Sequence, residues 1–235
     1  MSPQVYKVKL ADKEVLNNKF TRFDFELVDP HELEFLAGQY VSFLVSDKGE
    51  RRSYSISSSP DIKHGFSITV DVTPAGLGVT FLNNLKFGDE AQVLGAMGEF
   101  KIQLEPIEEE LVFIATGSGI APFRSMVIDL LKNKQDQRKI TLYWGLRHEE
   151  DMIWQDLFQD YAQTFGNFSF HPVLSQAQQE WPLCRGRVTD CLSIHDLPVK
   201  AGFYLCGNTA MIEDVKKVLL QRGVEQKLIH HEKFY

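Results

Sequence analysis

The chain has 235 residues, of which 43% are hydrophobic and 24% charged, so neither a disordered nor a collagen-like protein is expected. A net charge of −7 argues against a nucleic-acid binder, which needs a broad basic face. Residues 1–110 contain 11 Lys and Arg against 18 Asp and Glu, whereas residues 111–235 contain 14 of each. This asymmetry, in a chain long enough for two domains of ~100–130 residues, indicates two units of different kind.

The first half of the chain carries a β pattern. Short runs rich in aromatic and β-branched residues are separated by turn residues such as Asp29-Pro30 and Phe87-Gly88-Asp89. Strands are expected at residues 5–10, 21–28, 39–45, 52–57, 65–70 and 90–94. Short strands at this spacing predict a small antiparallel barrel or sandwich.

Residues 105–110, Glu-Pro-Ile-Glu-Glu-Glu, provide the expected boundary between two domains. A proline and three consecutive carboxylates disfavour a buried element. We therefore expect a first domain over residues 1–104, a linker over 105–110 and a second domain over 111–235.

From residue 111 onwards strands and helices alternate. Continuous apolar runs at 111–115, 140–144 and 203–206 are typical of strands buried on both faces of a parallel sheet. Helical patterns follow at 122–134, 149–162 and 209–222, and Gly223 is placed as a C-terminal cap. The alternation predicts a doubly wound parallel sheet.

The cysteines Cys184, Cys191 and Cys206 are odd in number and form no C-x-x-C motif. Neither a disulfide framework nor a zinc or iron–sulfur cluster is therefore expected. The histidines show no metal-binding pattern, and His230-His231 is expected on a strand surface. The chain has no apolar run of ~20 residues for a membrane span and no signal-peptide pattern at its start, so a cytoplasmic protein is expected.

A glycine loop lies between the first apolar run of the second half and a helical pattern. Thr116 leads into Gly117-Ser118-Gly119, and Pro122 follows. Glycines allow the backbone to approach a diphosphate, proline suits a first helical turn, and the free amides there attract anions. A bare strand–helix turn is the alternative, which the position between a buried strand and a helix disfavours.

The expected second strand of the sheet ends at Trp144-Gly145-Leu146-Arg147, without a carboxylate that would bind ribose hydroxyls. Arg147 can pair with a 2′-phosphate, or it can form surface ion pairs with nearby carboxylates. The sequence leaves both interpretations open.

One strand of the first half combines cations, an aromatic ring and hydroxyls. With a period of two, Arg52 and Tyr54 share one face, and Ser53 and Ser55 share the other. A cation for a diphosphate, an aromatic side chain for a ring system and a hydroxyl for a heteroatom suit a flavin nucleotide. The alternative is a polar barrel strand.

Several motifs in the same order resemble the ferredoxin–NADP reductase superfamily across essentially the whole chain. They are R-x-Y-S from Arg52, G-x-x-G-x-F from Gly95, G-S-G-I-A-P from Gly117, Y-W-G-L-R from Tyr143, Y-L-C-G-N from Tyr204 and the closing Glu232-Lys233-Phe234. The resemblance implies a six-stranded flavin-binding barrel followed by a domain that binds a nicotinamide nucleotide.

In the first domain, the resemblance implies that Arg52 contacts the flavin diphosphate, Tyr54 packs on the flavin and Ser55 approaches its reacting nitrogen. The resemblance also implies that Ser53 of this strand binds the flavin nucleotide. A second flavin-binding segment follows later in the chain, with Gly76, Gly78, Val79 and Thr80. Because the family's hydroxyl position falls on Val79, FMN remains an alternative to FAD.

In the second domain, the resemblance implies that the stretch from Thr116 to Pro122 holds the diphosphate of the nicotinamide nucleotide. Cys206, followed by Gly207, is implied near the nicotinamide, and Glu232 near the centre of hydride transfer. Ser55, Cys206 and Glu232 are therefore the expected catalytic residues, with no covalent nucleophile among them. Phe234 is implied to cover the flavin, with Tyr235 as the alternative.

The donor is NADPH or NADH. Relatives that prefer NADPH often have Ser-Arg after the third strand, where this sequence has Ser175-Gln176. Possible partners for the 2′-phosphate are Arg147, Arg185 and Arg187. The presence of Arg147 slightly favours NADPH over NADH.

The resemblance implies a flavin-dependent reductase that passes a hydride from the nucleotide to bound FAD and then electrons to a separate acceptor, ferredoxin or flavodoxin. One alternative is a flavin reductase that releases reduced flavin, and another is an electron-transfer subunit of a larger complex. The acidic first half weakens the case for an acidic carrier, which prefers a basic docking face. Neither a nucleic-acid partner nor a membrane span is expected.

Overall fold

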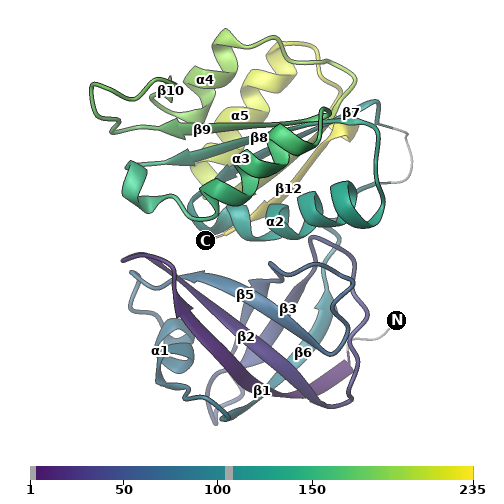
Figure 1. Cartoon of the computed structure of the whole chain (residues 1–235), viewed down its shortest axis with the longest axis vertical. Coiled ribbons are helices and arrows are strands. Elements are labelled where there is room, and N and C mark those ends of the chain that lie inside the picture. Colours follow the sequence, from purple (N-terminus) through teal and green to yellow (C-terminus); the bar gives the residue numbers. More distant parts are fainter. Residues whose placement is uncertain (1–3, 104–107, 235) are drawn as a thin grey trace. The chain divides into compact units, whose positions relative to one another are not determined.

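The computed structural model describes residues 4–103 and 108–234, and its backbone contacts divide the chain into two units (Figure 1). The first unit holds the chain up to Ile102 together with Ala121–Lys134. The second holds Gln103–Ile120 and the chain from Gln135 onwards.

The first unit contains the antiparallel barrel that the sequence predicts (Figure 1). Its strands lie in the order β4-β3-β6-β1-β2-β5, and a bridge between Ile56 and Ile68 joins the two ends of this six-stranded sheet. The strands are β1 (Gln4–Val15), β2 (Phe20–Asp29), β3 (Tyr40–Leu44), β4 (Arg51–Ser55), β5 (Gly65–Asp71) and β6 (Glu90–Met97).

Alternation of side chains along the strands builds the barrel core. Tyr6, Val8 and Leu10 of β1 point inward, and Lys7 and Lys9 between them point outward. The rings of Phe25 and Phe43 pack inside with centroids 5.0 Å apart, and Phe25 lies 5.6 Å from Phe66. These aromatic pairs explain why a small barrel of short strands has a well-filled interior.

Two helices belong to the first unit. The sequence pattern did not predict α1 (Leu77–Asn84), which buries Val79 and Leu82 in the barrel core. The second, α2 (Ile120–Ile128), continues as a π-helical turn over Asp129–Asn133. From Ala121 onwards it packs with the barrel, where the ring of Phe123 lies 5.7 Å from that of Phe100.

The second unit contains a parallel sheet, as predicted. Its six strands lie in the order β10-β9-β8-β7-β11-β12. On one side of β7 lie β8, β9 and β10, and on the other side lie β11 and β12. The strand order therefore reverses between β7 and β11. The strands are β7 (Glu110–Thr116), β8 (Lys139–Leu146), β9 (Phe168–Leu174), β10 (Cys184–Arg185), β11 (Gly202–Gly207) and β12 (Ile229–Lys233).

Helices cover both faces of this sheet (Figure 1). On one face α3 (Gln155–Thr164) packs Phe158 against Phe170, with ring centroids 5.1 Å apart. On the other face α4 (Val188–Ile194) and α5 (Thr209–Gln221) share a core cluster with β7. None of the helices in the described part of the chain has both the length and the hydropathy to cross a membrane. Short 3-10 turns cover Gly117–Gly119, Glu149–Asp151 and Gln226–Leu228.

The expectation that the carboxylates of 105–110 avoid a buried element is wrong for Glu108, which is fully buried. Its carboxylate accepts hydrogen bonds from the hydroxyl of Tyr204 and from Nε2 of His230, both at 2.8 Å. Burial raises the pKa of Tyr204 well above its usual value, so the hydroxyl keeps the proton that it donates. His230 is therefore half-buried rather than on a surface, and Glu110 already begins β7. Residues 105–107 lie outside the described residues.

The sequence was not expected to carry a disulfide framework, and it did not predict the single disulfide that joins Cys184 and Cys191. Cys184 lies on β10 and Cys191 on α4, with their Cα atoms 5.6 Å apart. A count and a spacing motif cannot show this proximity, since it results from the turn that links these two elements. Cys206 is the remaining cysteine, and it is buried with a free thiol.

Replacement of Glu108 by alanine should lower the free energy of unfolding of the second unit by about 2–4 kcal/mol, because Tyr204 and His230 lose their shared acceptor. Denaturant titration followed by tryptophan fluorescence measures this change, since all three tryptophans lie in the second unit. The matched control is Glu109→Ala at an exposed neighbour, which should change stability by less than about 0.5 kcal/mol. Equal losses in both variants would contradict the role of Glu108.

Candidate functional site

In the first unit, β4 and the start of α1 converge. A Cβ at Gly78 would collide with the hydroxyl of Tyr54 and would lie 2.9 Å from Cγ of Arg52. Arg52 and Tyr54 therefore project from β4 on the same side, as the strand period predicts, and only glycine leaves room for both. Arg52 is exposed, and the ring of Tyr54 is supported by the edge-on ring of Phe43 at 6.0 Å.

The first turn of α1 offers backbone donors at this place. The N-cap residue is Gly76, which has no side chain that could accept a hydrogen bond from the first turn. The amide of Thr80 donates to the Gly76 carbonyl at 2.9 Å, whereas helix geometry leaves the amides of residues 77–79 without a carbonyl in the helix. These amides, the positive end of the helix dipole and the Arg52 guanidinium together suit a diphosphate.

The hydroxyl position of this segment differs from the family pattern in a way that the structure explains. The Val79 side chain is 8% exposed and packs in the barrel core, so only its backbone amide is left for a ligand. Thr80 is exposed at the next position. On β4, Ser55 is buried opposite Tyr40, and Ser53 is exposed.

In the second unit, the carboxyl ends of β7 and β11 lie side by side, with Ala115 paired with Cys206. A Cβ at Gly119 would collide with the backbone carbonyl of Cys206. Gly207 adopts φ +147°, and a Cβ there would collide with Oγ1 of Thr116. The glycine loop is therefore held in van der Waals contact with the end of β11, at the point where the strand order reverses. Ligands of open α/β sheets bind at such a point.

Two residues that hold this edge belong to motifs found in the sequence, but no role was predicted for them. Nε1 of the fully buried Trp144 donates to the carbonyl of Gly117 at 3.0 Å, which fixes the loop. Asn208 caps α5 by accepting from the Met211 amide at 2.8 Å, and its Nδ2 donates to Oγ1 of Thr116 at 3.4 Å. An asparagine directly before a helical pattern is a capping signal that the sequence contained.

The predicted residues Cys206, Glu232 and Phe234 lie on the neighbouring strands β11 and β12 or directly after them. In the sheet Glu232 pairs with Cys206, and the amide of Phe234 donates to the carbonyl of Gly207 at 2.8 Å. Burial and then the charge of Glu232 raise the pKa of the Cys206 thiol well above its usual value. The thiol is therefore protonated at neutral pH, which fits the expectation that it is not a nucleophile. Tyr235 lies outside the described residues.

The loops after β8 and β9 are tied together. The amide of Ser175 donates to the carbonyl of Leu146 at 3.0 Å, and that of Gln176 to the carbonyl of Arg147 at 2.9 Å. The Arg147 side chain is exposed. Arg185 instead directs its guanidinium to the carbonyl of Trp181, at 2.8 Å. The exposed guanidinium of Arg147 is therefore more accessible than that of Arg185 to the 2′-phosphate of a nucleotide.

Two family models match the two halves of the chain. The oxidoreductase FAD-binding domain matches residues 7–102, and the oxidoreductase NAD-binding domain matches residues 113–217. The chain belongs to the ferredoxin–NADP reductase superfamily. It is accordingly an oxidoreductase whose cofactors are FAD and a nicotinamide nucleotide. Two places described above fit the phosphates of these cofactors, and we call them the glycine cradles. One is the start of α1 around Gly78, and the other is the edge formed by Gly119 and Gly207.

Solved structures of this superfamily share the fold. A ferredoxin–NADP⁺ reductase from Neisseria gonorrhoeae with bound FAD and NADP superposes with a TM-score of 0.82 over 100% of both chains, at 22% identity. The cytochrome P450 reductase GcoB from Amycolatopsis superposes with a TM-score of 0.89 at 26% identity, over 99% of this chain and 70% of that one.

Curated relatives are longer than this chain. The electron transfer component of anthranilate 1,2-dioxygenase from Acinetobacter baylyi is 31% identical over 205 residues, which are 86% of this chain and 59% of the relative. The reductase component of phenol 2-monooxygenase from a Pseudomonas species is 32% identical over 208 residues, which are 86% of this chain and 58% of the relative. The chain thus spans just under three fifths of the length of these relatives.

Replacement of Gly78 by alanine should weaken FAD binding by at least about tenfold, because the added Cβ displaces both Tyr54 and Arg52. The matched control is Gly166→Ala, a glycine outside the proposed cofactor-binding residues whose Cβ would meet nothing within 4 Å. The dissociation constant is measured by adding FAD to flavin-free protein and following the quenching of flavin fluorescence. The same affinity in both variants would contradict the assignment of this cradle.

Proposed function

We propose that the chain is a reductase that takes a hydride from NADPH or NADH and delivers electrons to a separate acceptor protein. The observation that supports this most directly is the pair of glycine cradles, one at the start of α1 and one at the carboxyl edge of β7 and β11. Bound FAD supplies the capacity to accept a hydride and to release its electrons in separate steps. The residues of the chain bind, orient and shield the reacting groups.

On the nicotinamide side, the amides of residues 117–119 and the hydroxyl of Thr116 bind the diphosphate, and Pro122 sets the first turn of the helix that follows. Cys206, with Gly207 beside it, contacts the nicotinamide. Glu232 sits next to Cys206 and tunes the transfer through its charge.

On the flavin side, Arg52 and the amides of the first turn of α1 bind the diphosphate, and Tyr54 packs on the ring system. Ser55 supplies a hydroxyl to the reacting nitrogen. The aromatic side chain of Phe234 covers the flavin, with Tyr235 as the alternative. Ser53 and Thr80 complete the polar surroundings.

We propose NADPH as the preferred donor. Arg147 is exposed after β8, and the hydrogen bonds of the two loops hold Ser175 beside the same segment. A guanidinium binds a phosphate in a bidentate manner, whereas a carboxylate here would favour free ribose hydroxyls. Comparing turnover with the two donors tests this choice, and a large preference for NADH would contradict it.

The acceptor is proposed to be an electron-carrying protein such as a ferredoxin, a flavodoxin or the oxygenase component of a dioxygenase. The name of the Acinetobacter relative, an electron transfer component, supports this class. A flavin reductase that releases reduced flavin is the second candidate. The burial of Val79 favours it, because the diphosphate loses a hydroxyl donor and the cofactor is held more loosely.

The two candidates differ in where FAD resides after purification. The reductase should remain yellow through dialysis and should reduce a one-electron protein acceptor such as a ferredoxin or cytochrome c without added flavin. A colourless protein that reduces only added flavin would contradict the first candidate and support the second. Protein with FAD restored, but no oxidation of either NADPH or NADH, would overturn both.

A further inference from the structure

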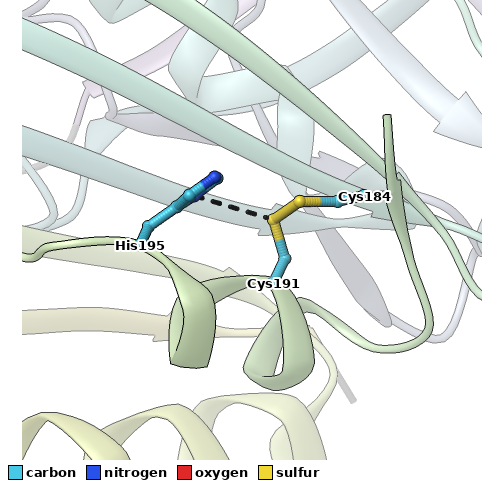
Figure 2. Close-up of side chains that lie close together, drawn as sticks. All are labelled: Cys184, Cys191 and His195. Atoms are coloured by element: carbon cyan, nitrogen blue, oxygen red, sulfur yellow. Dashed lines mark hydrogen bonds between the residues drawn. A yellow bond between two sulfur atoms is a disulfide. The ribbon is translucent and has the colours of Figure 1, made fainter. Parts of the chain in front are cut away.

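A compact group of sulfur and nitrogen atoms lies on β10 and α4, and the proposed function gives it no role. It consists of the two sulfurs of Cys184 and Cys191 and one ring nitrogen of His195, which all lie within 4.8 Å of one another (Figure 2). Cys191 is buried, while Cys184 and His195 are half-buried. Two thiols and an imidazole form a ligand set that zinc prefers.

We propose that Cys184, Cys191 and His195 bind a zinc ion once the disulfide between the two cysteines has been reduced. These residues lie on β10, on α4 and directly after it, whereas the glycine contacts lie at the start of α1 and at the ends of β7 and β11. The proposal does not depend on which electron acceptor the chain serves.

The helix positions two of the ligands. Cys191 lies on α4 and His195 follows its last residue, so the two are four residues apart and face the same side. Sγ of Cys191 lies 3.9 Å from Nδ1 of His195. In a tetrahedral zinc site, sulfur and nitrogen ligands are about 3.6 Å apart, so small side-chain rotations suffice.

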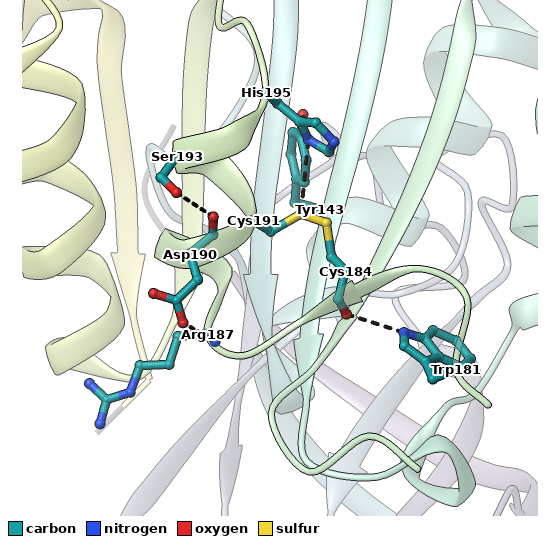
Figure 3. Close-up of a disulfide and its surroundings, with 8 residues drawn as sticks. All are labelled: Tyr143, Trp181, Cys184, Arg187, Asp190, Cys191, Ser193 and His195. Carbon is teal, nitrogen blue, oxygen red and sulfur yellow. Dashed lines mark hydrogen bonds between the residues drawn. A yellow bond between two sulfur atoms is a disulfide. The ribbon is translucent and has the colours of Figure 1, made fainter. Parts of the chain in front are cut away.

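The third ligand comes from the edge of the sheet. Cys184 pairs with Val173 of β9, and its carbonyl accepts a hydrogen bond from Nε1 of Trp181 at 3.1 Å (Figure 3). Both contacts are made by the backbone of Cys184 and do not involve its sulfur. The Cα atoms of Cys184 and Cys191 are 5.6 Å apart, a distance at which the sulfurs are either bonded or, after rotation about Cα–Cβ, about 3.8 Å apart on one metal.

The start of α4 is fixed as well. The carboxylate of Asp190 accepts from the amide of Arg187 at 2.7 Å, and the hydroxyl of Ser193 donates to the Asp190 carbonyl at 2.6 Å (Figure 3). The capping interaction holds the turn between β10 and α4. The ligands are thus carried by a sheet strand and a capped helix, which keeps the cost of ordering them low.

A fourth coordination position is available from solvent. A cavity of about 380 Å³ is lined by Cys184, His195 and His171, so a metal held by the first two lies at its wall. The ring of His171 is 5.1 Å from that of His195. Water from the cavity or the imidazole of His171 completes the tetrahedron.

Tyr143 distinguishes metal binding from a purely structural role. Its hydroxyl lies 3.0 Å from Nδ1 of His195, the same nitrogen that faces Cys191 (Figure 3). A metal on Nδ1 replaces this hydrogen bond. Tyr143→Phe should therefore leave zinc affinity unchanged or increase it, because the competing partner is gone.

The chemistry has two balanced steps. A small dithiol reductant gives two electrons and two protons to the disulfide, becomes a cyclic disulfide itself, and leaves Cys184 and Cys191 as thiols. Zinc then displaces both thiol protons to solvent and forms two Zn–S bonds and one bond to neutral His195. No electron moves in the second step, since zinc is not redox-active.

The test compares the oxidised and reduced forms of the wild-type chain of 235 residues, prepared without free reductant and identified by intact mass. Zinc is titrated against a coloured chelator, and cobalt is then substituted so that its d–d absorption, at longer wavelength than oxidised flavin, reports thiolate ligands. The reduced form should bind one zinc per chain at least about 100-fold more tightly than the oxidised form. Equal affinities of the two forms would overturn the proposal without any variant.

Variants locate the ion. In the reduced protein, Cys184→Ser and His195→Asn should each weaken zinc binding by at least about tenfold. Cys206→Ser and His231→Asn are the matched controls for a thiol and an imidazole elsewhere, and both should bind zinc as the wild type does. Loss of binding in Cys206→Ser with retention in Cys184→Ser would overturn the assignment. Tryptophan fluorescence verifies that each variant is folded.

Discussion

The close contact between the glycine loop and the end of β11 is the constraint on which the second unit depends. Gly119 leaves no room for a Cβ against the carbonyl of Cys206, and Gly207 leaves none against Thr116. The two neighbouring parallel strands can therefore end at the same level with their backbones exposed to a ligand. Trp144 and Asn208 hold this arrangement from either side, through hydrogen bonds to Gly117 and Thr116.

In the barrel, a missing side chain also allows a close approach, but here between side chains and a helix start. At Gly78 the missing side chain makes space for Tyr54 and Arg52, so an aromatic ring and a cation meet the free amides of α1. We propose that both units use a glycine before a helix to bring backbone donors to a phosphate-bearing ligand. Neither cradle needs a large positive charge, which explains how a chain of net charge −7 can serve two anionic nucleotides.

Much of this was predictable because its signals are local. Alternation in residues 65–70 predicted a barrel strand, and the run before Thr116 predicted the first strand of a parallel sheet. Long-range partners were not predictable. Glu108 has two hydrogen-bond donors about a hundred residues away in sequence, and the disulfide of Cys184 depends on how β10 turns into α4. The helix α1 was missed because Gly78 and the short length of the helix weaken the helical pattern.

The central claim, that the chain accepts a hydride from a nicotinamide nucleotide, is tested most directly by rapid anaerobic mixing of FAD-loaded protein with NADPH or NADH deuterated at the transferred position. The account predicts that flavin absorbance bleaches in a single turnover and that deuterium on one face of the nicotinamide slows the bleaching. Glu232→Gln, which removes the charge beside Cys206, should alter this rate while the protein retains FAD. No bleaching with either donor, in protein shown to hold FAD, would contradict the account.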